Sequence, residues 1–588
     1  MNMNYALSKT DKNKLNPKFS TVVRRLRPFL AGEKRDVIIG LGAILISSGA
    51  ALLTPIIISH TVDKYIRVGN YSGVFFYSVI LLVIYIFFLF SSYTQIKTMG
   101  AVGRRVLFNL RNALFNKLQE LPVAFFNQNK AGDLISRINS DTDQLNQFFA
   151  QALMQFLSNF FLIVGAGIFL LVLNIRLGLA ALLPAAAALI FTQVVSPWIK
   201  KKNLKNLRAL GGMSAEIQES LNNFKAVVAF NRLDYFRDKF NSANQNNYLA
   251  AVGAGIANNI FTPVYGLVSN FAQIIVLGYG TYLITANELS IGLLIGFILY
   301  VNNFYMPLRQ LASVWSSLQQ ALAGLDRIYE VLSLQSDMEI IPAEKDLKAA
   351  SLVEFRDVNF GYPDGKVVLH NINFALEKGK TYALVGPTGG GKTTTASLMA
   401  RLYDPTSGKI FLEGRDLRSF DPKERAKKIG FILQEPFLFT GTVRENIIYG
   451  NEQYQKYSDE ELQGVIEKAG LSGLLARFEN NLQTKVAASG DSISLGQKQL
   501  IAFMRVALRS PELVILDEAT ANIDTVTEQL LEEILKKLPP TTTKVIIAHR
   551  LNTISSADAI FFVNSGEITM AGSMEHAVEM LLKDKRAS

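Results

Sequence analysis

Six long apolar stretches lie between residues 36 and 315, and they constrain the fold more than any other feature of the chain. Examples are DVIIGLGAILISSGAALLTPIIISHTV, YSGVFFYSVILLVIYIFFLFSSY and IGLLIGFILYVNNFYMPLRQLA. A helix needs roughly 20 apolar residues to cross a hydrocarbon layer of about 30 Å. A single stretch could be a buried helix of a water-soluble protein, but six in one half predict a polytopic α-helical membrane domain.

The composition supports this prediction and excludes several chemistries. The chain has 588 residues, too many for one core, with 49% hydrophobic and 19% charged residues and a mean hydropathy of +0.21. It contains no cysteine, which excludes disulfides, thiolate metal sites and a cysteine nucleophile. The N-terminal stretch lacks a continuous apolar core and a small-residue cleavage site, so we predict no cleaved signal peptide.

The net charge of +11 could indicate nucleic acid or an anionic membrane face, and the positions of the cations decide between them. Basic residues gather in the leader and in the two long connections that follow the second and fourth stretches. The alternate loops are short and hold only Lys64, Arg67 and Arg176. The positive-inside rule then places both termini and the long connections in the cytoplasm of a multi-pass plasma (inner) membrane protein, and no nucleic acid partner is expected.

The chain divides into regions of different pattern. The long connections have helical periodicity, so the second and fifth spans should continue into the cytoplasm. Breaks around GDLISRINSD and FKAVVAFNRLDYF predict short transverse helices there. Beyond the spans the chain becomes polar and then alternates strand-like and helical runs. We predict an N-terminal segment with an elbow helix over 1–35, a six-span domain over 36–322, a linker over 323–350 and an α/β domain over 351–588.

The stretch TYALVGPTGGGKTTTASLMARLY predicts a strand, a glycine-rich loop and a helix. It matches G-x-x-x-x-G-K-[ST] from Gly386 to Thr393 in the context that this phosphate-binding motif requires. The glycines allow backbone N–H groups to face phosphate oxygens, and Lys392 can reach the β- and γ-phosphates. The Thr393 hydroxyl can ligate Mg²⁺.

Two further predicted strands end in polar residues. In PELVILDEAT the predicted strand ends in two carboxylates. Asp517 is placed to hold the Mg²⁺ hydration shell, and Glu518 is placed to polarise an attacking water. In KVIIAHRL the predicted strand ends at His549. A histidine that stands alone is more often structural than catalytic.

With these motifs in order, nearly the whole chain resembles the ATP-binding cassette (ABC) transporters in their exporter half-transporter form. The resemblance implies ATP and Mg²⁺ as cofactors and ATP hydrolysis coupled to transport. It assigns catalysis to Glu518, His549, Gln434 and Lys392, and Mg²⁺ binding to Thr393, Gln434 and Asp517. The residues that match the ATP site are the adenine-stacking Tyr362, the Walker A residues Gly386, Pro387, Thr388, Gly389, Gly390, Gly391, Lys392 and Thr393, and the adjoining Thr394.

The sequence ISLGQ, residues 493–497, stands where this family has Leu-Ser-Gly-Gly-Gln. The resemblance implies that Ser494, Gly496 and Gln497 contact the ATP of a second subunit, and that Leu495 restricts the backbone where the family has glycine. TKVAASG and ANID also depart from the family pattern, although the D-loop residue Asp524 is kept. Because all departures fall on the face offered to a partner, they favour a heterodimer with a second ABC half-transporter; harmless variation in a homodimer is the alternative.

The resemblance further implies export or flipping of a substrate by alternating access, with membrane lipid around the spans. No charged cluster appears within the spans, so a small amphipathic or hydrophobic drug or lipid is the expected substrate. The polar candidates for its cavity are Tyr265, Asn270, Gln273, Asn302 and Asn303. They could equally join one helix to another. An ATP-gated regulator or channel remains a rival function, whereas a soluble cassette ATPase conflicts with the six spans.

Overall fold

The computed structural model describes residues 4–7, 19–148, 152–343, 351–363, 365–487, 493–517, 525–547, 557–572, 575, 576 and 579. The chain forms two compact units. The helical unit comprises Ser8–Gln119 and Gly132–Ser333, and the α/β unit comprises Met1–Leu7, Glu120–Ala131 and Leu334–Ser588. Both units are therefore assembled from separate pieces of the sequence.

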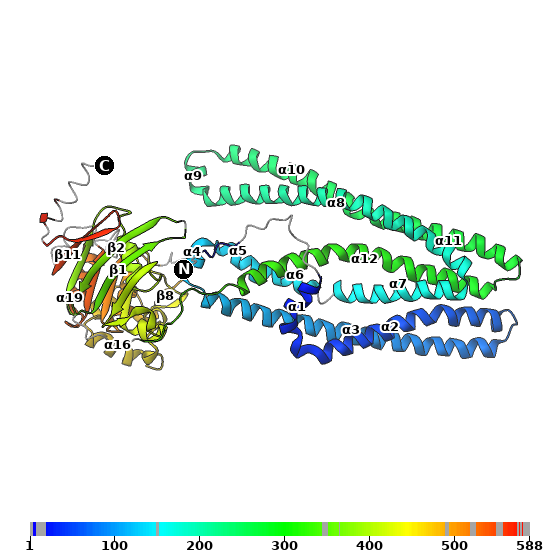
Figure 1. Cartoon of the computed structure of the whole chain (residues 1–588), viewed down its shortest axis with the longest axis horizontal. Helices are drawn as coiled ribbons and strands as arrows, with labels where there is room; N and C mark the ends of the chain where they lie inside the picture. The colour runs from blue at the N-terminus through cyan, green and yellow to red at the C-terminus, as the bar shows by residue number, and fades with distance from the viewer. Residues whose placement is uncertain are drawn as a thin grey trace. The chain divides into compact units, whose positions relative to one another are not determined.

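Within the described residues, six helical segments are long and apolar enough to cross a membrane, which confirms the predicted spans. Five of them contain α2 (Lys34–Thr61), α3 (Tyr71–Glu120), α7 (Leu153–Leu173), α8 (Ile175–Asn222), and α10 (Leu233–Asn259) with α11 (Phe261–Thr285). The sixth, Ile291–Leu311, is the first part of α12 (Ile291–Leu332). Helix α1 (Phe19–Leu30) begins before the first of them. Figure 1 shows α8 running beside α10 and α11. In the most apolar part of α3, no residue is buried by the rest of the chain, as expected for a helix that faces lipid.

Both long connections contain short helices. In the second, α9 (Phe224–Ala229) lies within the predicted break. In the first, α4 (Val123–Gln128) precedes the predicted break, and residues 132–141 lie in α5 (Ala131–Ser136) and a π-helical turn (Arg137–Asp141), followed by α6 (Thr142–Gln147). The reason is Pro122, which caps α4 in an extended conformation and cannot continue α3.

Small residues allow the spanning helices to approach closely. Ala166 of α7, Ala181 of α8 and Ala272 of α11 are fully buried in one cluster. A Cβ on Gly178 would lie 2.3 Å from the Leu170 carbonyl oxygen, so only glycine fits where α7 turns into α8. Close backbone contact of this kind stabilises helices in lipid, where apolar surface alone provides no drive to associate.

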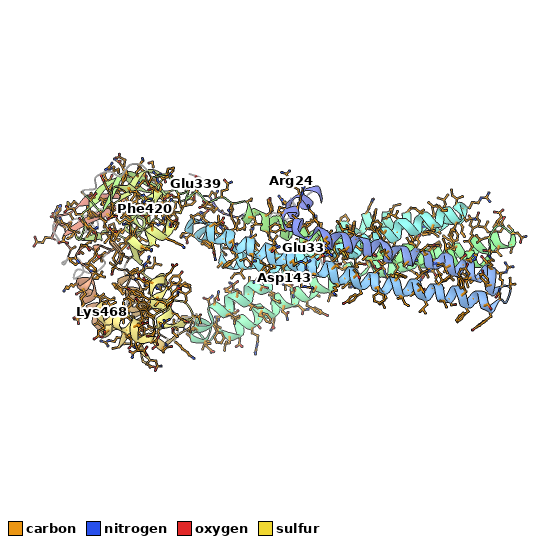
Figure 2. The ribbon with its side chains drawn as sticks, turned by 90° about the horizontal axis from the view of Figure 1, so that it is seen from below. Arg24, Glu33, Asp143, Glu339, Phe420 and Lys468 are labelled. Atoms are coloured by element: carbon orange, nitrogen blue, oxygen red, sulfur yellow. The ribbon has the colours of Figure 1, made fainter. Side chains whose placement is uncertain are left out.

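The cytoplasmic ends of the helical unit carry ion pairs. Glu33, labelled in Figure 2, accepts hydrogen bonds from Arg105 of α3, with Nη2 to Oε2 at 2.6 Å. Arg137 is buried and donates to Glu330 Oε2 at 2.8 Å and to the Arg327 carbonyl at 2.7 Å. The contacts of Arg137 join it to α12. This helix continues to Leu332, beyond residue 323, where the linker is predicted to start.

The α/β unit contains, in its described residues, a six-stranded sheet ordered β12-β11-β3-β10-β9-β6. Its strands are β3 (Thr381–Val385), β6 (Ile429–Ile432), β9 (Leu513–Asp517), β10 (Thr543–Ile547), β11 (Ala559–Asn564) and β12 (Glu567–Met570); all but β12 are parallel. The inner strands are continuous runs of buried apolar residues, as parallel strands covered on both faces require. This confirms the predicted α/β domain.

A second, antiparallel sheet has the order β2-β1-β4-β5, and a short pair joins β7 to β8. These strands are β1 (Val353–Gly361), β2 (Val367–Leu376), β4 (Ser407–Leu412), β5 (Arg415–Asp416), β7 (Gly441–Thr442) and β8 (Lys485–Val486). The helices are α13 (Lys392–Met399), α14 (Pro422–Lys428), α15 (Val443–Ile448), α16 (Asp459–Lys468), α17 (Ser472–Leu475), α18 (Leu495–Ala507) and α19 (Thr525–Lys537).

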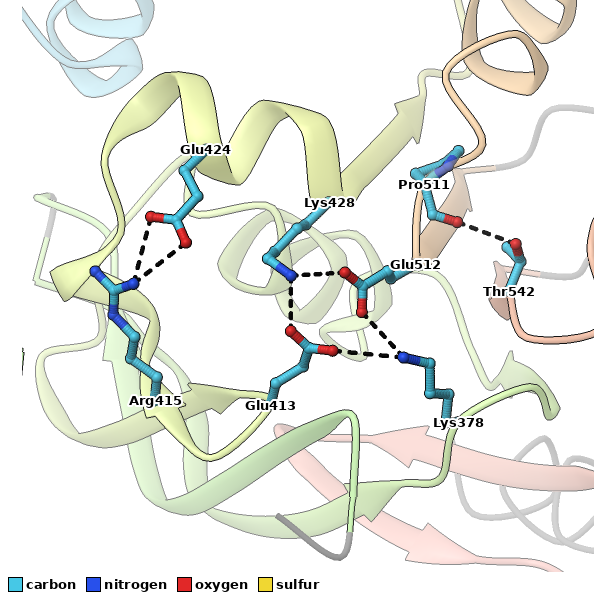
Figure 3. A network of polar contacts seen from close by, with 8 residues as sticks. All are labelled: Lys378, Glu413, Arg415, Glu424, Lys428, Pro511, Glu512 and Thr542. Atoms are coloured by element: carbon cyan, nitrogen blue, oxygen red, sulfur yellow. Dashed lines mark hydrogen bonds and ion pairs between the residues drawn. The ribbon is translucent and has the colours of Figure 1, made fainter. Parts of the chain in front are cut away.

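Alternating charges connect the two sheets (Figure 3). Lys428 at the end of α14 lies 2.7 Å from Glu413 in the β4–β5 turn and 2.6 Å from Glu512 just before β9. Lys378 after β2 contacts the same two carboxylates at 3.5 and 3.3 Å. Each cation thus touches both anions, and the four residues tie the antiparallel sheet to the edge where β9 begins.

Candidate nucleotide site

The glycine-rich loop lies between β3 and α13, at the carboxyl end of the parallel sheet. Gly386, Gly389 and Gly391 have φ values of +150°, +83° and +115°, which L side chains rarely adopt. A Cβ on Gly386 would lie 2.0 Å from the Val563 carbonyl oxygen, and one on Gly390 would lie 2.6 Å from the same atom. The loop therefore rests on the backbone of β11, where a side chain at Gly386 or Gly390 does not fit.

Lys392 is the first residue of α13, and its side chain is buried. Its Nζ donates to the carbonyl oxygens of Gly386 and Pro387, both at 2.9 Å. The ammonium group thus folds back over the loop instead of extending into solvent. A cation, the N-terminus of an eight-residue helix and a glycine-rich backbone together form a site suited to phosphate.

Asp517 is the last residue of β9 and is buried. In the sheet register both Asp517 and Leu384 pair with Ile547 of β10, so the ends of β3 and β9 lie on either side of one strand. Thr393 Oγ1 donates to Asp517 Oδ1 at 3.2 Å.

A hydroxyl and a carboxylate oxygen side by side fit Mg²⁺, which takes few protein ligands and keeps waters and phosphate oxygens. Among the described residues no group of three or more His, Cys, Asp or Glu could hold a metal by itself. The residues therefore suit an ion that arrives with a nucleotide.

Three aromatic rings lie beside α13. The Tyr362 hydroxyl oxygen is 3.1 Å from Thr394 Oγ1, within hydrogen-bond distance. The Tyr362 ring meets Phe360 and Tyr403 edge to face, with centroids 5.0 and 5.5 Å apart. These contacts fix a half-buried aromatic next to the phosphate cradle. Tyr403 is a site residue that sequence reasoning missed, because it belongs to no local motif and reaches Tyr362 only through the fold.

Gln434 follows β6 by two residues and is exposed. Because β6 pairs in parallel with β9, and Ile432 pairs with Leu516, Gln434 and Asp517 leave the sheet at the same edge. Three predicted residues, Glu518, Asp524 and His549, lie outside the described residues.

The ISLGQ segment forms the start of helix α18. Ser494 is the N-cap: its Oγ accepts from the Gln497 N–H at 3.2 Å, while Gln497 Oε1 accepts from the Ser494 N–H at 2.9 Å. Gln497 Nε2 donates to the Arg477 carbonyl at 3.0 Å, so both ends of its amide are engaged within the chain.

Leu495 is the first residue of α18, where the backbone is helical. A helical position accepts any L residue without strain, so leucine fits here. The prediction that its Cβ restricts the backbone relative to glycine stays a prediction. What leucine adds is a bulky side chain at the helix N-terminus.

The predicted cavity residues fall into two groups. Tyr265 is buried, with its hydroxyl 2.7 Å from Thr192 Oγ1 of α8, and Asn303 donates to the Ala51 carbonyl of α2 at 3.3 Å. These two join helices. Asn270 and Asn302 are exposed, and Gln273 Nε2 donates to Asn302 Oδ1 at 2.8 Å between α11 and α12. This second group remains accessible on the helical unit.

Two protein-family models match the chain. One, described as the ABC transporter transmembrane region, matches residues 37–308, and one described as ABC transporter matches residues 369–521.

Curated relatives cover most of the chain. The uncharacterized ABC transporter ATP-binding protein YfiC of Bacillus subtilis is 33% identical over 95% of this chain and 92% of its own length. A fatty acid ABC transporter ATP-binding/permease protein of Mycobacterium bovis is 31% identical over 82% of this chain and 76% of its own. A multidrug resistance ABC transporter ATP-binding and permease protein of Lactococcus lactis subsp. lactis is 31% identical, over 82% and 81%.

Proposed function

The chain belongs to the ABC transporter family, and from that premise we propose that it is one half of an exporter that moves an amphipathic or hydrophobic drug or lipid across the membrane. It is a multi-pass membrane protein with a cytoplasmic ATPase domain, and it couples ATP hydrolysis to transport. The observation that carries the proposal is the convergence of Lys392, Thr393 and Asp517 in a chain with six apolar spans.

The names of two relatives support the substrate class, since one is called a fatty acid transporter and another a multidrug resistance transporter. The helical unit is compatible with such a substrate. The hydrogen-bonded amides of Gln273 and Asn302, with Asn270, offer polar contacts without a charge. A molecule with an apolar body and an uncharged or weakly charged polar end suits these side chains better than an ion does.

We assign the chain's own half of an ATP site to the residues around the glycine-rich loop. Lys392 and the loop amides bind phosphate oxygens, and Tyr362 stacks on the adenine while Thr394 fixes its hydroxyl. Thr393, Asp517 and Gln434 hold Mg²⁺ with its waters, and Glu518 and His549 orient and polarise the attacking water. Bound Mg²⁺ supplies charge neutralisation for the transferred phosphoryl group.

Ser494, Gly496 and Gln497 are assigned to the ATP site of the partner. The Ser494 oxygen accepts the Gln497 N–H, which leaves the hydroxyl hydrogen free to donate to a phosphate oxygen. Gln497 keeps Ser494 in place through the reciprocal cap and its bond to the Arg477 carbonyl. Gln497 is therefore proposed to act by positioning Ser494.

A second subunit is needed because half-transporters carry one ATPase domain each and act as dimers. The short helix α9 supports this, since Phe224, Val228 and the following Phe230 are exposed, the last by 78%. Apolar side chains on a cytoplasmic helix favour a protein contact. We favour a different chain as the partner, because Leu495 adds bulk at the start of α18; a homodimer with two equal sites is the alternative.

The test is reconstitution of the intact transporter into proteoliposomes, with rhodamine 6G and a fluorescent long-chain fatty acid as probes. We expect ATP-dependent movement of at least one probe, and we expect Lys392→Ala to abolish it together with ATP hydrolysis. Wild-type protein that hydrolyses ATP but moves neither probe would refute the proposed substrate class. Movement that persists in Glu518→Gln would favour the rival function of an ATP-gated channel.

A further inference from the structure

Residues 4–7, near the start of the chain, belong to the α/β unit, although the other segments of that unit begin only at residue 120. Tyr5 has only 3% of its surface exposed, although Asn4 and Ala6 on either side are exposed. Terminal segments are ordinarily poorly ordered unless specific contacts hold them. We name residues 4–7 the N-terminal clamp, and its contacts show what it holds.

The clamp is bonded to the end of α4. The Tyr5 N–H donates to Gln128 Oε1 at 2.9 Å, and the Leu7 N–H donates to Asn129 Oδ1 at 3.0 Å. Asn129 Nδ2 returns a bond to the Tyr5 carbonyl at 3.0 Å and another to the Phe125 carbonyl at 2.8 Å. The Asn129 side chain thus satisfies both the clamp and the last turn of α4. The Tyr5 ring meets the fully buried Phe125 ring edge to face, with centroids 6.5 Å apart.

The other end of Tyr5 is bonded to the segment that follows α12. Its hydroxyl donates to the Asp337 carboxylate and accepts from the Asp337 N–H, the latter at 2.8 Å. Burial of the ring, and then the neighbouring Asp337 carboxylate, raise the pKa of Tyr5, so the hydroxyl keeps its proton at any physiological pH. One buried side chain therefore joins α4 to the chain that leads into β1.

The opposite side of α4 contacts the aromatic rings beside the nucleotide site. Asn127 Nδ2 donates to the Tyr403 hydroxyl at 2.6 Å, and Tyr403 meets Tyr362, which bonds to Thr394 next to the glycine-rich loop. The short helix is therefore attached on one side to the site that binds ATP and on the other side to the clamp.

We propose that Tyr5 is a positioning residue that fixes α4 to the α/β unit, so that ATP-driven movement of this unit is passed through α4 to α3 and the rest of the first long connection. Without the Tyr5 side chain, α4 loses the ring contact of Phe125 and the link to Asp337, while the Asn127–Tyr403 bond and the backbone bonds of the clamp remain. The ATPase domain then turns over ATP while α4 follows its movement only in part. Tyr5 touches neither ATP nor substrate, and its effect is on coupling.

The variants for the test lie in one short segment. Tyr5→Ala removes the ring and both Asp337 bonds, whereas Tyr5→Phe removes both Asp337 bonds with the hydroxyl but keeps the ring against Phe125. Ala6→Ser is the matched control, because Ala6 is exposed and the substitution leaves every backbone bond of the clamp in place.

The first measurement is amide hydrogen exchange of residues 120–131 in the intact, lipid-reconstituted transporter, with and without ATP plus vanadate. We expect exchange to be about tenfold faster in Tyr5→Ala, faster by a smaller factor in Tyr5→Phe, and unchanged in Ala6→Ser. Unchanged exchange in Tyr5→Ala would overturn the proposal. This readout needs no substrate, so it decides the role of Tyr5 even if the wild type moves neither probe and the proposed function fails.

The second measurement is probe transport per ATP hydrolysed, which rests on the proposed function. We expect this ratio to fall about five- to tenfold in Tyr5→Ala while the kcat and KM for ATP stay within about twofold of the wild type. A proportional fall of transport and ATPase activity, with a lower Tm, would show a merely structural residue and overturn the proposal.

Discussion

Removal of the Glu512 carboxylate should destabilise the α/β unit by a magnitude that the four-residue ion network allows us to work out. The neighbouring Glu413 carboxyl, as a hydrogen-bond partner, and then the ammonium groups of Lys428 and Lys378 lower the pKa of Glu512 from 4.5 to about 2. The full shift corresponds to about 3 kcal/mol. At neutral pH both carboxylates are ionised and do not share a hydrogen bond, so only the part due to the ammonium groups stabilises the folded chain. The side chains of Glu512 and Lys428 are 28% and 23% exposed, so solvent screens part of the interaction. We expect Glu512→Gln to lower the free energy of unfolding by about 1–2 kcal/mol.

The assay is a double-mutant cycle with Glu512→Gln and Lys428→Met in the full chain, in which urea-dependent hydrogen exchange of the α14 and β9 amides reports the free energy of unfolding. We expect a coupling energy of about 1 kcal/mol. The exposed pair Lys380–Glu377 is the matched control, and we expect no measurable coupling between its two charges.

The same network predicts the direction of the pH dependence. Because the pKa of Glu512 is lower in the folded chain than in the unfolded chain, its contribution is complete above about pH 5 and is lost as the pH falls towards 2. A coupling energy near zero, or a loss of stability on acidification that is identical in the wild type and Glu512→Gln, would refute this reasoning.

Three further substitutions test other parts of the structure. Gly386→Ala places a Cβ 2.0 Å from the Val563 carbonyl oxygen and should weaken ATP binding, measured by a fluorescent ATP analogue, by about 100-fold or more, whereas Gly473→Ala, with open space around it, should leave binding unchanged. Arg137→Ala removes a buried guanidinium together with its bonds to Glu330 and the Arg327 carbonyl, and should lower the stability of the helical unit by about 2 kcal/mol in calorimetry, with Arg137→Lys costing less; equal losses in both would contradict the argument. Leu495→Gly should cost about 1 kcal/mol of stability or less, and should raise ATP turnover by no more than about twofold if one of two sites is already fully active. A much larger gain in turnover would favour two identical hindered sites.

Much of the architecture could be predicted because its signals are local. A helix needs about 20 apolar residues to cross the bilayer, so each of the six spans is visible as one continuous run. A phosphate-binding loop needs its glycines between a strand and a helix, so it is visible as one short motif. The parallel order of the sheet then brings Thr393 to Asp517, although the two are far apart in the sequence.

The features that the sequence did not reveal depend on tertiary contacts or on the backbone of Pro122. Pro122 sets the start of α4, which precedes the predicted break at residues 132–141, whereas α5 lies within that break. The burial of Tyr5 against α4 has no local signal, since it depends on Asn129 and Asp337 from two other segments. The capping box of Ser494 and Gln497, which makes Leu495 the first residue of α18, also depends on the local fold.

The central claim is that this chain is one half of a heterodimeric exporter, and the most direct test is the native mass and subunit identity of the complex extracted from its own membrane in mild detergent. The account predicts one copy of this 65.1 kDa chain together with a different ABC half-transporter that has Leu-Ser-Gly-Gly-Gln where this chain has ISLGQ. Two copies of this chain, with twice its mass and equal ATP turnover at both sites, would contradict it.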